Sequence, residues 1–213
     1  MDQEIIIAIL AAGASSRLGS PKQLARLNGQ TLIARMVQEA QSVPHHHLFV
    51  VTGAYREEVN KALDGFSFHE IWNPNFAHGI GSSLRCLHGM LTRPTHWDVP
   101  LMILACDQIF VNHQVLNDLI QSFRGVFCHS DNRQRVAAVC DYGGVLGLPV
   151  LISPRLWEDL GSLGDNEGAK KLWNAPMVHV QTISCPQAQW DIDTPEDCQI
   201  HGIQLFPRGG DLS

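Results

Sequence analysis

The sequence predicts an α/β protein in three layers, with a mostly parallel central sheet flanked by helices on both sides. Strand-like apolar runs alternate with helix-like segments along the chain, which is the pattern of βαβ units. Residues 5–10 form a near-continuous apolar run, as expected for a strand buried on both faces. A length of 213 residues suits one α/β domain with a sizeable core, so we expect residues 1–213 to form a single domain.

The remaining elements are predicted from hydrophobic periodicity and from residues that start or stop helices. Thr31 is a candidate N-cap for a helix over residues 32–40, and Pro44 closes that segment. Thr194 and Pro195 have the pattern of a helix start. In order, we expect strands at 48–52, 66–72, 101–105, 136–142 and 178–183, and helices at 56–63, 81–91, 115–123, 156–160 and 167–173.

Composition excludes several classes of protein. The net charge is −6 and no long basic run is present, so we expect no nucleic-acid partner. No stretch approaches the roughly 20 apolar residues that a membrane helix requires, and the N-terminus lacks the features of a signal peptide. Six cysteines without a C-x-x-C pair indicate reduced thiols, and we therefore expect a cytoplasmic protein without a membrane association.

A glycine-rich loop follows the first strand and ends in a basic residue. Residues 11–22 read Ala-Ala-Gly-Ala-Ser-Ser-Arg-Leu-Gly-Ser-Pro-Lys. Small residues let the backbone approach a ligand closely, and their N–H groups can surround anionic oxygens. Arg17 and Lys22 add the positive charge that a phosphate chain needs, and Ser15 and Ser16 add hydroxyl donors. The loop therefore predicts a phosphate-binding site.

Two common phosphate loops are excluded by spacing. A Walker A loop has four residues between its glycines and then Lys-Ser/Thr, whereas five residues separate Gly13 from Gly19 here and Ser-Pro follows. The G-x-G-x-x-G fingerprint of dinucleotide-binding proteins is absent.

Asp107 follows the clearest later strand and is a candidate metal ligand. In open parallel sheets ligands bind beyond the carboxyl ends of the strands, so Asp107 and the glycine-rich loop should lie along one edge. A carboxylate there suits Mg²⁺, which prefers oxygen ligands and bridges substrate phosphates. An aspartate in this position is equally often a turn or helix-cap residue, and spacing alone does not separate the two interpretations.

Two further segments carry candidate site residues. Asp191 and Asp193 lie on the same side of an extended segment, and with Asp107 they could form a metal site; a solvated loop before a capped helix is the alternative. Residues 73–84 join a strand to a helix. Gly79, Ser82 and Ser83 there could present N–H groups and hydroxyls to a ligand, although serine capping explains them as well.

The loop pattern Leu-Ala-Ala-Gly-x-Ser-x-Arg-x-Gly-x-x-Lys, at residues 10–22, resembles the signature of the MobA-like nucleotidyltransferases. It is most similar to the MocA-type branch, which contains molybdenum cofactor cytidylyltransferase. Cys-Asp-Gln at 106–108, Asp-Ile-Asp-Thr-Pro-Glu-Asp at 191–197 and the motif at 73–84 also match, in the family's order. Ile109 stands where the family has proline, and the family motif at 164–170 carries one extra residue here. The resemblance implies a Rossmann-like, GT-A-like nucleotidyltransferase fold.

The resemblance also assigns roles to these residues. It implies a catalytic role for Arg17, Lys22 and Asp107, and Mg²⁺ as the cofactor. It favours Asp193 over Asp191 as the second metal ligand beside Asp107. The implied nucleotide-binding residues are Leu10, Ala11, Ala12, Gly13, Ser15, Ser16, Arg17, Lys22, Gly79, Ser82 and Ser83.

The resemblance further implies the substrates. Relatives with Leu-Ala-Ala-Gly in the loop tend to use CTP, so residues 10–13 favour CTP, with molybdopterin as the phosphate-bearing acceptor. A molybdoenzyme or its maturation factor is the protein partner that this function implies. Two alternatives stay open. One is a cytidylyl- or uridylyltransferase for a sugar or polyol phosphate, and the other is a non-catalytic nucleotide- or cofactor-binding protein.

Overall fold

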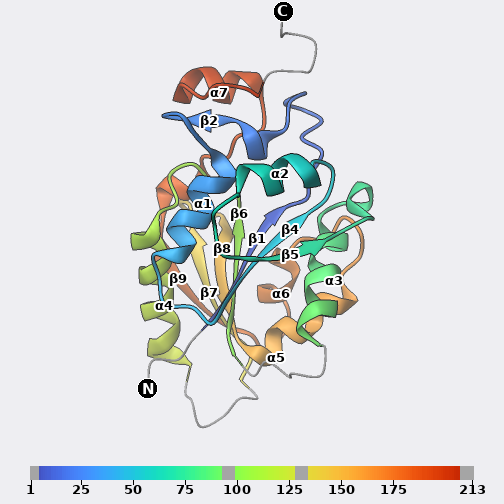
Figure 1. Cartoon of the computed structure of the whole chain (residues 1–213). Helices are drawn as coiled ribbons and strands as arrows, with labels where there is room; N and C mark the ends of the chain where they lie inside the picture. Colours follow the sequence, from blue (N-terminus) through green and yellow to red (C-terminus); the bar gives the residue numbers. More distant parts are fainter. Residues whose placement is uncertain (1–4, 93–98, 128–133, 207–213) are drawn as a thin grey trace, which may run out of the picture.

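The computed structural model describes residues 5–92, 99–127 and 134–206, and Cys128 therefore lies outside the described part of the chain. Its main sheet has seven strands (Figure 1). Their order across the sheet is β5 (His69–Trp72), β4 (His47–Thr52), β1 (Ile6–Ala11), β6 (Leu101–Ala105), β8 (Leu146–Ile152), β7 (Val136–Asp141) and β9 (His179–Ser184). All neighbouring pairs are parallel except those that β8 makes with β6 and β7. The prediction of a mostly parallel sheet is confirmed.

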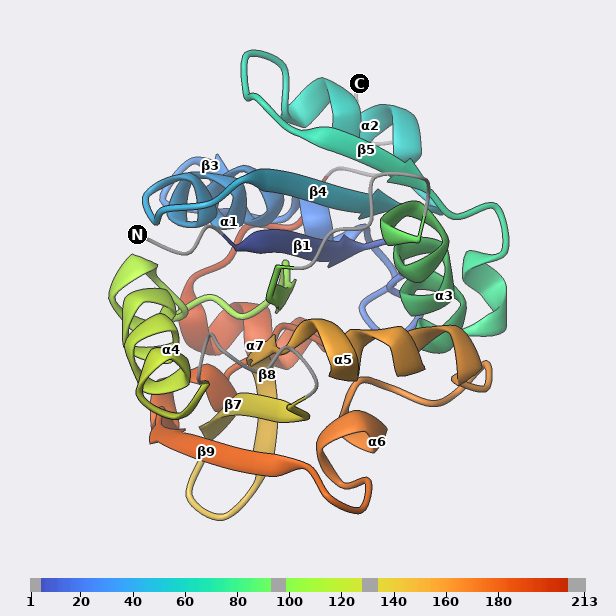
Figure 2. The same ribbon diagram turned by 90° about the horizontal axis from the view of Figure 1, so that it is seen from below.

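Helices cover both faces of this sheet and make the three predicted layers. Figure 2 shows α1 (Leu32–Gln41) and α4 (His113–Val126) on one side, and α3 (Ile80–Leu91), α5 (Pro154–Trp157) and α6 (Lys170–Trp173) on the other. The first side also receives α2 (Arg56–Ala62), whose Val59 belongs to the same core cluster as α1 and α4. α7 (Pro195–His201) and the short hairpin of β2 (Arg26–Leu27) and β3 (Gln30–Thr31) lie beyond the end of the sheet (Figure 1).

Strand β1 is the centre of the core, as its apolar sequence predicts. Ile7 and Ile9 belong to the cluster beneath α1 and α4, whereas Ile6 and Ala8 belong to the cluster beneath α3 and α5. All four side chains are fully buried. An apolar run without alternation is therefore explained by two covered faces.

The helix starts follow the expected capping chemistry. The Thr31 side chain accepts a hydrogen bond from the N–H of Ala34, so the predicted cap of α1 is confirmed. Thr194 caps α7 in a capping box with Asp197, and Pro195 occupies the first turn. Asn112 caps α4 and moves its start to His113, two residues before the predicted boundary.

The structure differs from the predicted elements in several places. Strand β8 was not predicted, because Gly147 and Pro149 interrupt a pattern that otherwise reads as a strand. The strand expected from residue 66 begins at His69, since Phe66 and Phe68 pack against the core outside the ladder. The helix expected over 167–173 is confined to α6; before it, the Glu167 carboxylate accepts from the N–H of Gly164 and holds a turn.

The helix expected over residues 156–160 is also different. α5 occupies residues 154–157 and continues as a 3₁₀ helix over Glu158–Ser162. The five described cysteines are free thiols, four of them buried, in agreement with the prediction of reduced cysteines. Among the described helices, none has the length and apolar character needed to cross a membrane.

Truncation of Ile7 tests the central position of β1. We expect Ile7→Ala to lower the free energy of unfolding by about 2–5 kcal/mol, because its fully buried side chain leaves a cavity beneath two helices. Urea denaturation measures the change. Ile200→Ala is the matched control, since Ile200 on α7 is 70% exposed and its loss should cost under about 0.5 kcal/mol. Equal effects of the two changes would contradict the described core.

Candidate active site

The glycine-rich loop and Asp107 emerge at the same edge of the sheet, as predicted. β1 and β6 are parallel neighbours, and Leu10 is in register with Ala105. The loop begins at Ala12, directly after β1, and Asp107 follows two residues after β6 ends. Parallel pairing with short connections therefore places both features side by side at the carboxyl ends of the strands.

Gln23 holds the two ends of the loop together. Its side-chain amide donates to the carbonyl of Ala11 at 2.9 Å and to that of Gly13 at 2.7 Å. Gln23 is fully buried, and the hydroxyl of Ser15 accepts from the N–H of Lys22 at 3.1 Å. Sequence reasoning missed Gln23, because a glutamine beside a lysine in a polar segment looks like a surface residue.

Four charged side chains meet beside the loop. The Lys22 ammonium contacts Asp107 Oδ2 and lies 3.2 Å from Asp193 Oδ1. Arg17 Nη2 lies 2.6 Å from Asp193 Oδ2. The Asp107 side chain is only 9% exposed, whereas that of Arg17 is 71% exposed. Burial opposes the charge on Lys22, but the Asp107 carboxylate and, more weakly, Asp193 outweigh it and raise the pKa of Lys22 above its usual range. Lys22 is therefore charged at neutral pH.

Backbone pairing brings the segment that contains Asp191 and Asp193 close to Asp107. Gln108 and Asp191 form an isolated antiparallel bridge, and the N–H of Ile192 donates to the carbonyl of Asp107 at 3.3 Å. Burial, followed by the charges of Asp107 and Asp193, raises the pKa of the Asp191 carboxyl. All three candidate metal ligands thus lie near one another.

Among the described residues, Asp193 rather than Asp191 contacts the basic residues of the loop. Its backbone is positioned by α7: the Asp197 carboxylate accepts from the N–H of Asp193 at 3.1 Å and from that of Thr194 at 2.7 Å. Hydrogen bonds, first that of the Thr194 side chain, lower the pKa of Asp197. Within the described ranges, no group of three or more His, Cys, Asp or Glu side chains is arranged to hold a metal ion. A metal here would use two carboxylates and other ligands.

The side chain of Gln108 connects three parts of the site. Its Nε2 lies within hydrogen-bond distance of the carbonyls of Leu148, at 2.7 Å, and Ala188, at 2.9 Å, and of the Tyr142 hydroxyl, at 3.1 Å. Gln108 is 6% exposed, and its buried Oε1 has no hydrogen-bond partner among the described residues. Ile109, where the family has proline, packs with Leu18 and Ile192 in a small core cluster. The residue that departs from the family pattern therefore fills a core position beside the site.

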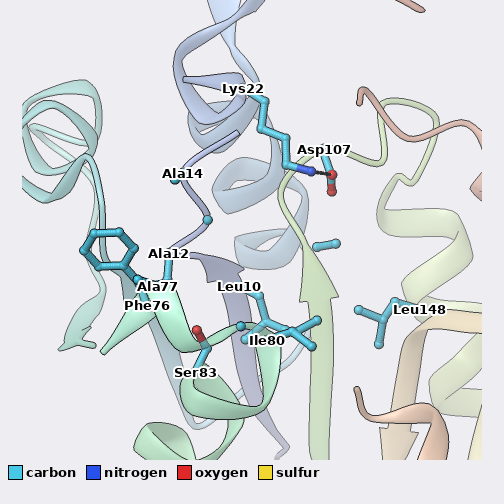
Figure 3. A pocket seen from close by; sticks show the side chains of 13 residues that line it. Leu10, Ala12, Ala14, Lys22, Phe76, Ala77, Ile80, Ser83, Asp107 and Leu148 are labelled. Atoms are coloured by element: carbon cyan, nitrogen blue, oxygen red, sulfur yellow. Dashed lines mark hydrogen bonds and ion pairs between the residues drawn. The ribbon is translucent and has the colours of Figure 1, made fainter. Parts of the chain in front are cut away.

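A cavity of about 520 Å³ opens between the loop, α3 and β6 (Figure 3). The predicted nucleotide-binding or catalytic residues that line it are Leu10, Ala12, Gly13, Lys22, Gly79, Ser83 and Asp107. Phe76, Ile80 and Leu148 add an apolar wall that sequence reasoning did not identify. A smaller cavity of about 150 Å³ is lined by Gly13, Ser15, Ser16, Arg17, Leu18, Lys22 and Asp193. Lys22 and Gly13 line both.

The two remaining predicted nucleotide-binding residues, Ala11 and Ser82, are buried. Ala11 is 2% exposed at the end of β1. Ser82 is 3% exposed, and its hydroxyl donates to the carbonyl of Gly79 at 2.7 Å. The buried amide of Asn73 donates to the hydroxyls of Ser82, at 2.8 Å, and Ser83, at 3.0 Å. Asn73 was noted in the motif at 73–84, but its buried role follows from the tertiary structure alone.

The start of α3 is in close contact with the turn at residues 163–167. The N–H of Gly81 donates to the carbonyl of Asp165 at 2.9 Å, and a Cβ on Gly81 would lie 1.9 Å from the carbonyl oxygen of Gly164. Arg85 contacts both the Leu163 carbonyl and the Asp165 carboxylate. The turn therefore packs against the start of α3, where Ile80 and Ser83 line the cavity.

A mostly parallel sheet with a glycine-rich loop and paired carboxylates at its edge is the architecture typical of a nucleotide-binding α/β protein. The chain belongs to the MobA-like NTP transferase family, whose model matches residues 7–180. Among curated proteins, the bifunctional protein GlmU of Rhodococcus opacus is 27% identical over 132 residues, which is 58% of this chain and 26% of that protein. GlmU of Marinomonas sp. is 33% identical over 109 residues, or 48% and 23% of the two chains. The chain thus spans about a quarter of the length of these relatives.

Solved structures resemble the chain over nearly its whole length. A homologue of Mycobacterium tuberculosis Rv0371c from Mycobacterium sp. strain JC1 has a TM-score of 0.70 and 27% identity, covering 92% of this chain and 93% of that one. A nucleotidyl transferase from Methanothermobacter has a TM-score of 0.74 and 23% identity, covering 95% and 97%. Rv0371c itself, in complex with manganese, has a TM-score of 0.67 and 23% identity, covering 93% and 97%.

A methyl group at Gly81 tests the close contact between α3 and the turn at residues 163–167. We expect Gly81→Ala to destabilise the protein by about 1–3 kcal/mol, because the backbone of Gly164 cannot yield as a flexible side chain could. Gly89→Ala is the matched control in the same helix. A Cβ at Gly89 meets nothing within 4 Å, so that change should stabilise α3 by about 0.5–1 kcal/mol. Denaturant unfolding of both variants measures the difference, and changes of the same sign would contradict this packing.

Proposed function

We propose that the protein transfers CMP from CTP to a phosphate-bearing acceptor, with molybdopterin as the acceptor, and releases pyrophosphate. The observation that carries this proposal is the charged cluster that borders the two cavities. There, a charged lysine and two aspartates from distant segments meet beside a loop of small residues. Membership of the MobA-like NTP transferase family supports the same reaction class.

The two cavities suit the two ends of a nucleoside triphosphate. The larger one has apolar walls from Leu10, Phe76 and Ile80, which fit a nucleoside, and its volume of about 520 Å³ is in the range of small-molecule sites. The smaller one is lined by the hydroxyl-bearing Ser15 and Ser16 and by Arg17, which suit phosphate oxygens. Lys22 borders both cavities and can contact the phosphate chain.

The donor set fits a magnesium ion. Mg²⁺ is usually held by one or two carboxylates together with water and substrate phosphates, so the pair Asp107 and Asp193 suffices. A cationic group, the Lys22 ammonium, already lies between these carboxylates. The manganese complex of Rv0371c supports divalent metal use. We assign Asp107 and Asp193 as the ligands, with Asp191 beside them; the bound metal would neutralise charge on the reacting phosphates.

The reaction needs little from the protein besides positioning and charge. An oxygen of the acceptor phosphate attacks the α-phosphorus of CTP, the bond from the α-phosphorus to the bridging oxygen breaks, and pyrophosphate leaves. Arg17 and Lys22 stabilise the negative charge on the phosphates, and backbone N–H groups of residues 12–16 orient them. No protein nucleophile is required.

The preference for CTP rests on Ala12. Its side chain lines the cavity, and it lies against the turn at Gly53, where an added Cβ would be 2.8 Å from the Ala12 Cβ. A methyl group at this fixed position leaves less room for a purine than glycine would. Steric discrimination by one methyl is modest, about 1–3 kcal/mol.

The second candidate is a cytidylyl- or uridylyltransferase for a sugar or polyol phosphate, since a CMP:2-keto-3-deoxy-manno-octonic acid synthetase complexed with CTP shares the fold. Both candidates share the nucleotide site and differ in acceptor. A non-catalytic binding protein would keep nucleotide binding without pyrophosphate release.

Calorimetry with CTP, GTP, ATP and UTP, each with and without Mg²⁺, tests the nucleotide. We expect Mg²⁺-dependent binding with CTP strongest, since Mg²⁺ and the loop both act on the phosphates while Ala12 disfavours purines. Preference for UTP would favour the sugar-phosphate candidate, and preference for GTP would refute the Ala12 argument. Pyrophosphate release is then measured with molybdopterin and with sugar phosphates, and its absence with all acceptors would favour the binding protein.

Replacement of Lys22 tests its role in transfer. Lys22→Ala should lower the rate of pyrophosphate release by on the order of a hundredfold or more, because a charge aimed at the transition state is lost. Lys61→Ala, at an exposed lysine of α2, is the matched control and should leave the rate unchanged. Unfolding curves of both variants separate catalysis from stability. Unchanged turnover of the Lys22 variant would remove this residue from the mechanism.

A further inference from the structure

The Lys22 ammonium occupies the space between the two carboxylates that we assign to the metal. It contacts Asp107 Oδ2 and lies 3.2 Å from Asp193 Oδ1 (Figure 3 shows the contact with Asp107). With its side chain 9% exposed, the Asp107 carboxylate requires a positive partner, and Lys22 supplies one from within the chain. A divalent cation bound by the same oxygens would have to displace this ammonium.

The backbone of Lys22 is fixed, but its side chain can move. Ser15 accepts from its N–H, and the next residue, Gln23, is fully buried and donates to the carbonyls of Ala11 and Gly13 at the start of the loop. Four flexible methylene groups carry the ammonium. Lys22 borders both the cavity of about 520 Å³ and the cavity of about 150 Å³ beside Ser15. The ammonium can therefore exchange carboxylate partners for phosphate oxygens without a change in the fold.

We propose that Lys22 makes metal binding conditional on the nucleotide: its ammonium keeps the cation site closed until triphosphate oxygens draw it away. The charges are consistent with this exchange. With Arg17 on Asp193, the two carboxylates and two cationic side chains are neutral, whereas a divalent cation in place of the Lys22 ammonium would leave one net positive charge, which triphosphate oxygens would offset. The displaced ammonium then faces the phosphates, which supply its new negative partners. The proposal rests on the proposed function only for the identity of Asp107 and Asp193 as metal ligands.

Binding of Mn²⁺ alone, without nucleotide or acceptor, tests the proposal. Mn²⁺ is titrated into the full chain and the free ion is followed by electron paramagnetic resonance. We expect Lys22→Met to bind Mn²⁺ at least about tenfold more tightly than the unmodified protein, because a tethered competitor acts at an effective concentration near the millimolar range. Equal affinity of the two proteins would overturn the proposal.

Three further variants test whether the gain in Mn²⁺ affinity comes from removal of the Lys22 ammonium. Arg17→Met should change the Mn²⁺ affinity much less, because Arg17 contacts Asp193 through a mostly exposed side chain. Asp107→Asn in the Lys22→Met background should abolish the gain, and a gain that persists there would overturn the proposal. Lys22→Gln keeps a polar group and serves if Lys22→Met does not fold; it too should bind Mn²⁺ more tightly, and equal affinity would count against the proposal.

The test separates this proposal from the proposed function. Since no nucleotide or acceptor is present, a protein that uses GTP or a sugar phosphate would still give the expected Mn²⁺ result. Conversely, a protein that transfers CMP but binds Mn²⁺ equally with and without Lys22 would refute the proposal and leave the proposed function in place.

Discussion

Strand β1 pairs in parallel with β4 on one side and β6 on the other, and this pairing brings the functional segments to one edge of the sheet. The loop after β1 and the aspartate after β6 start from neighbouring, in-register positions. Because β1 is buried on both faces, its register is also enforced by two separate core clusters. A slip of one residue would exchange the two faces and displace the loop from Asp107.

Buried side-chain amides position the segments that surround the site. Gln23 ties the ends of the loop, Gln108 connects the β6 end with Leu148 and Ala188, and Asn73 holds the serines at the start of α3. An amide can donate two hydrogen bonds in a fixed plane without introducing charge, so it can orient backbone segments beside a charged centre. The site is thus supported by neutral groups, while its charges remain available to a ligand.

The electrostatic arrangement has one consequence for function. Asp107 and Asp193 come from segments separated from Lys22 by 85 and 171 residues, and they meet only when the chain is folded. In the folded protein, each carboxylate already has a positive partner, so the cluster stabilises itself before any ligand arrives. A ligand that enters must therefore replace existing ion-pair contacts, which is the basis for the coupling that we propose between nucleotide and metal.

Features whose physical causes lie within a few residues could be predicted from the sequence. The apolar run of β1, the loop of small residues and the Thr194 cap of α7 are all readable because their causes lie within a few residues. The tertiary structure alone decided the antiparallel insertion of β8, the burial of Gln23 and Gln108, and the contact of Asp193 rather than Asp191 with Lys22. These features depend on which distant segments become neighbours, and periodicity along one segment carries no information about its partners.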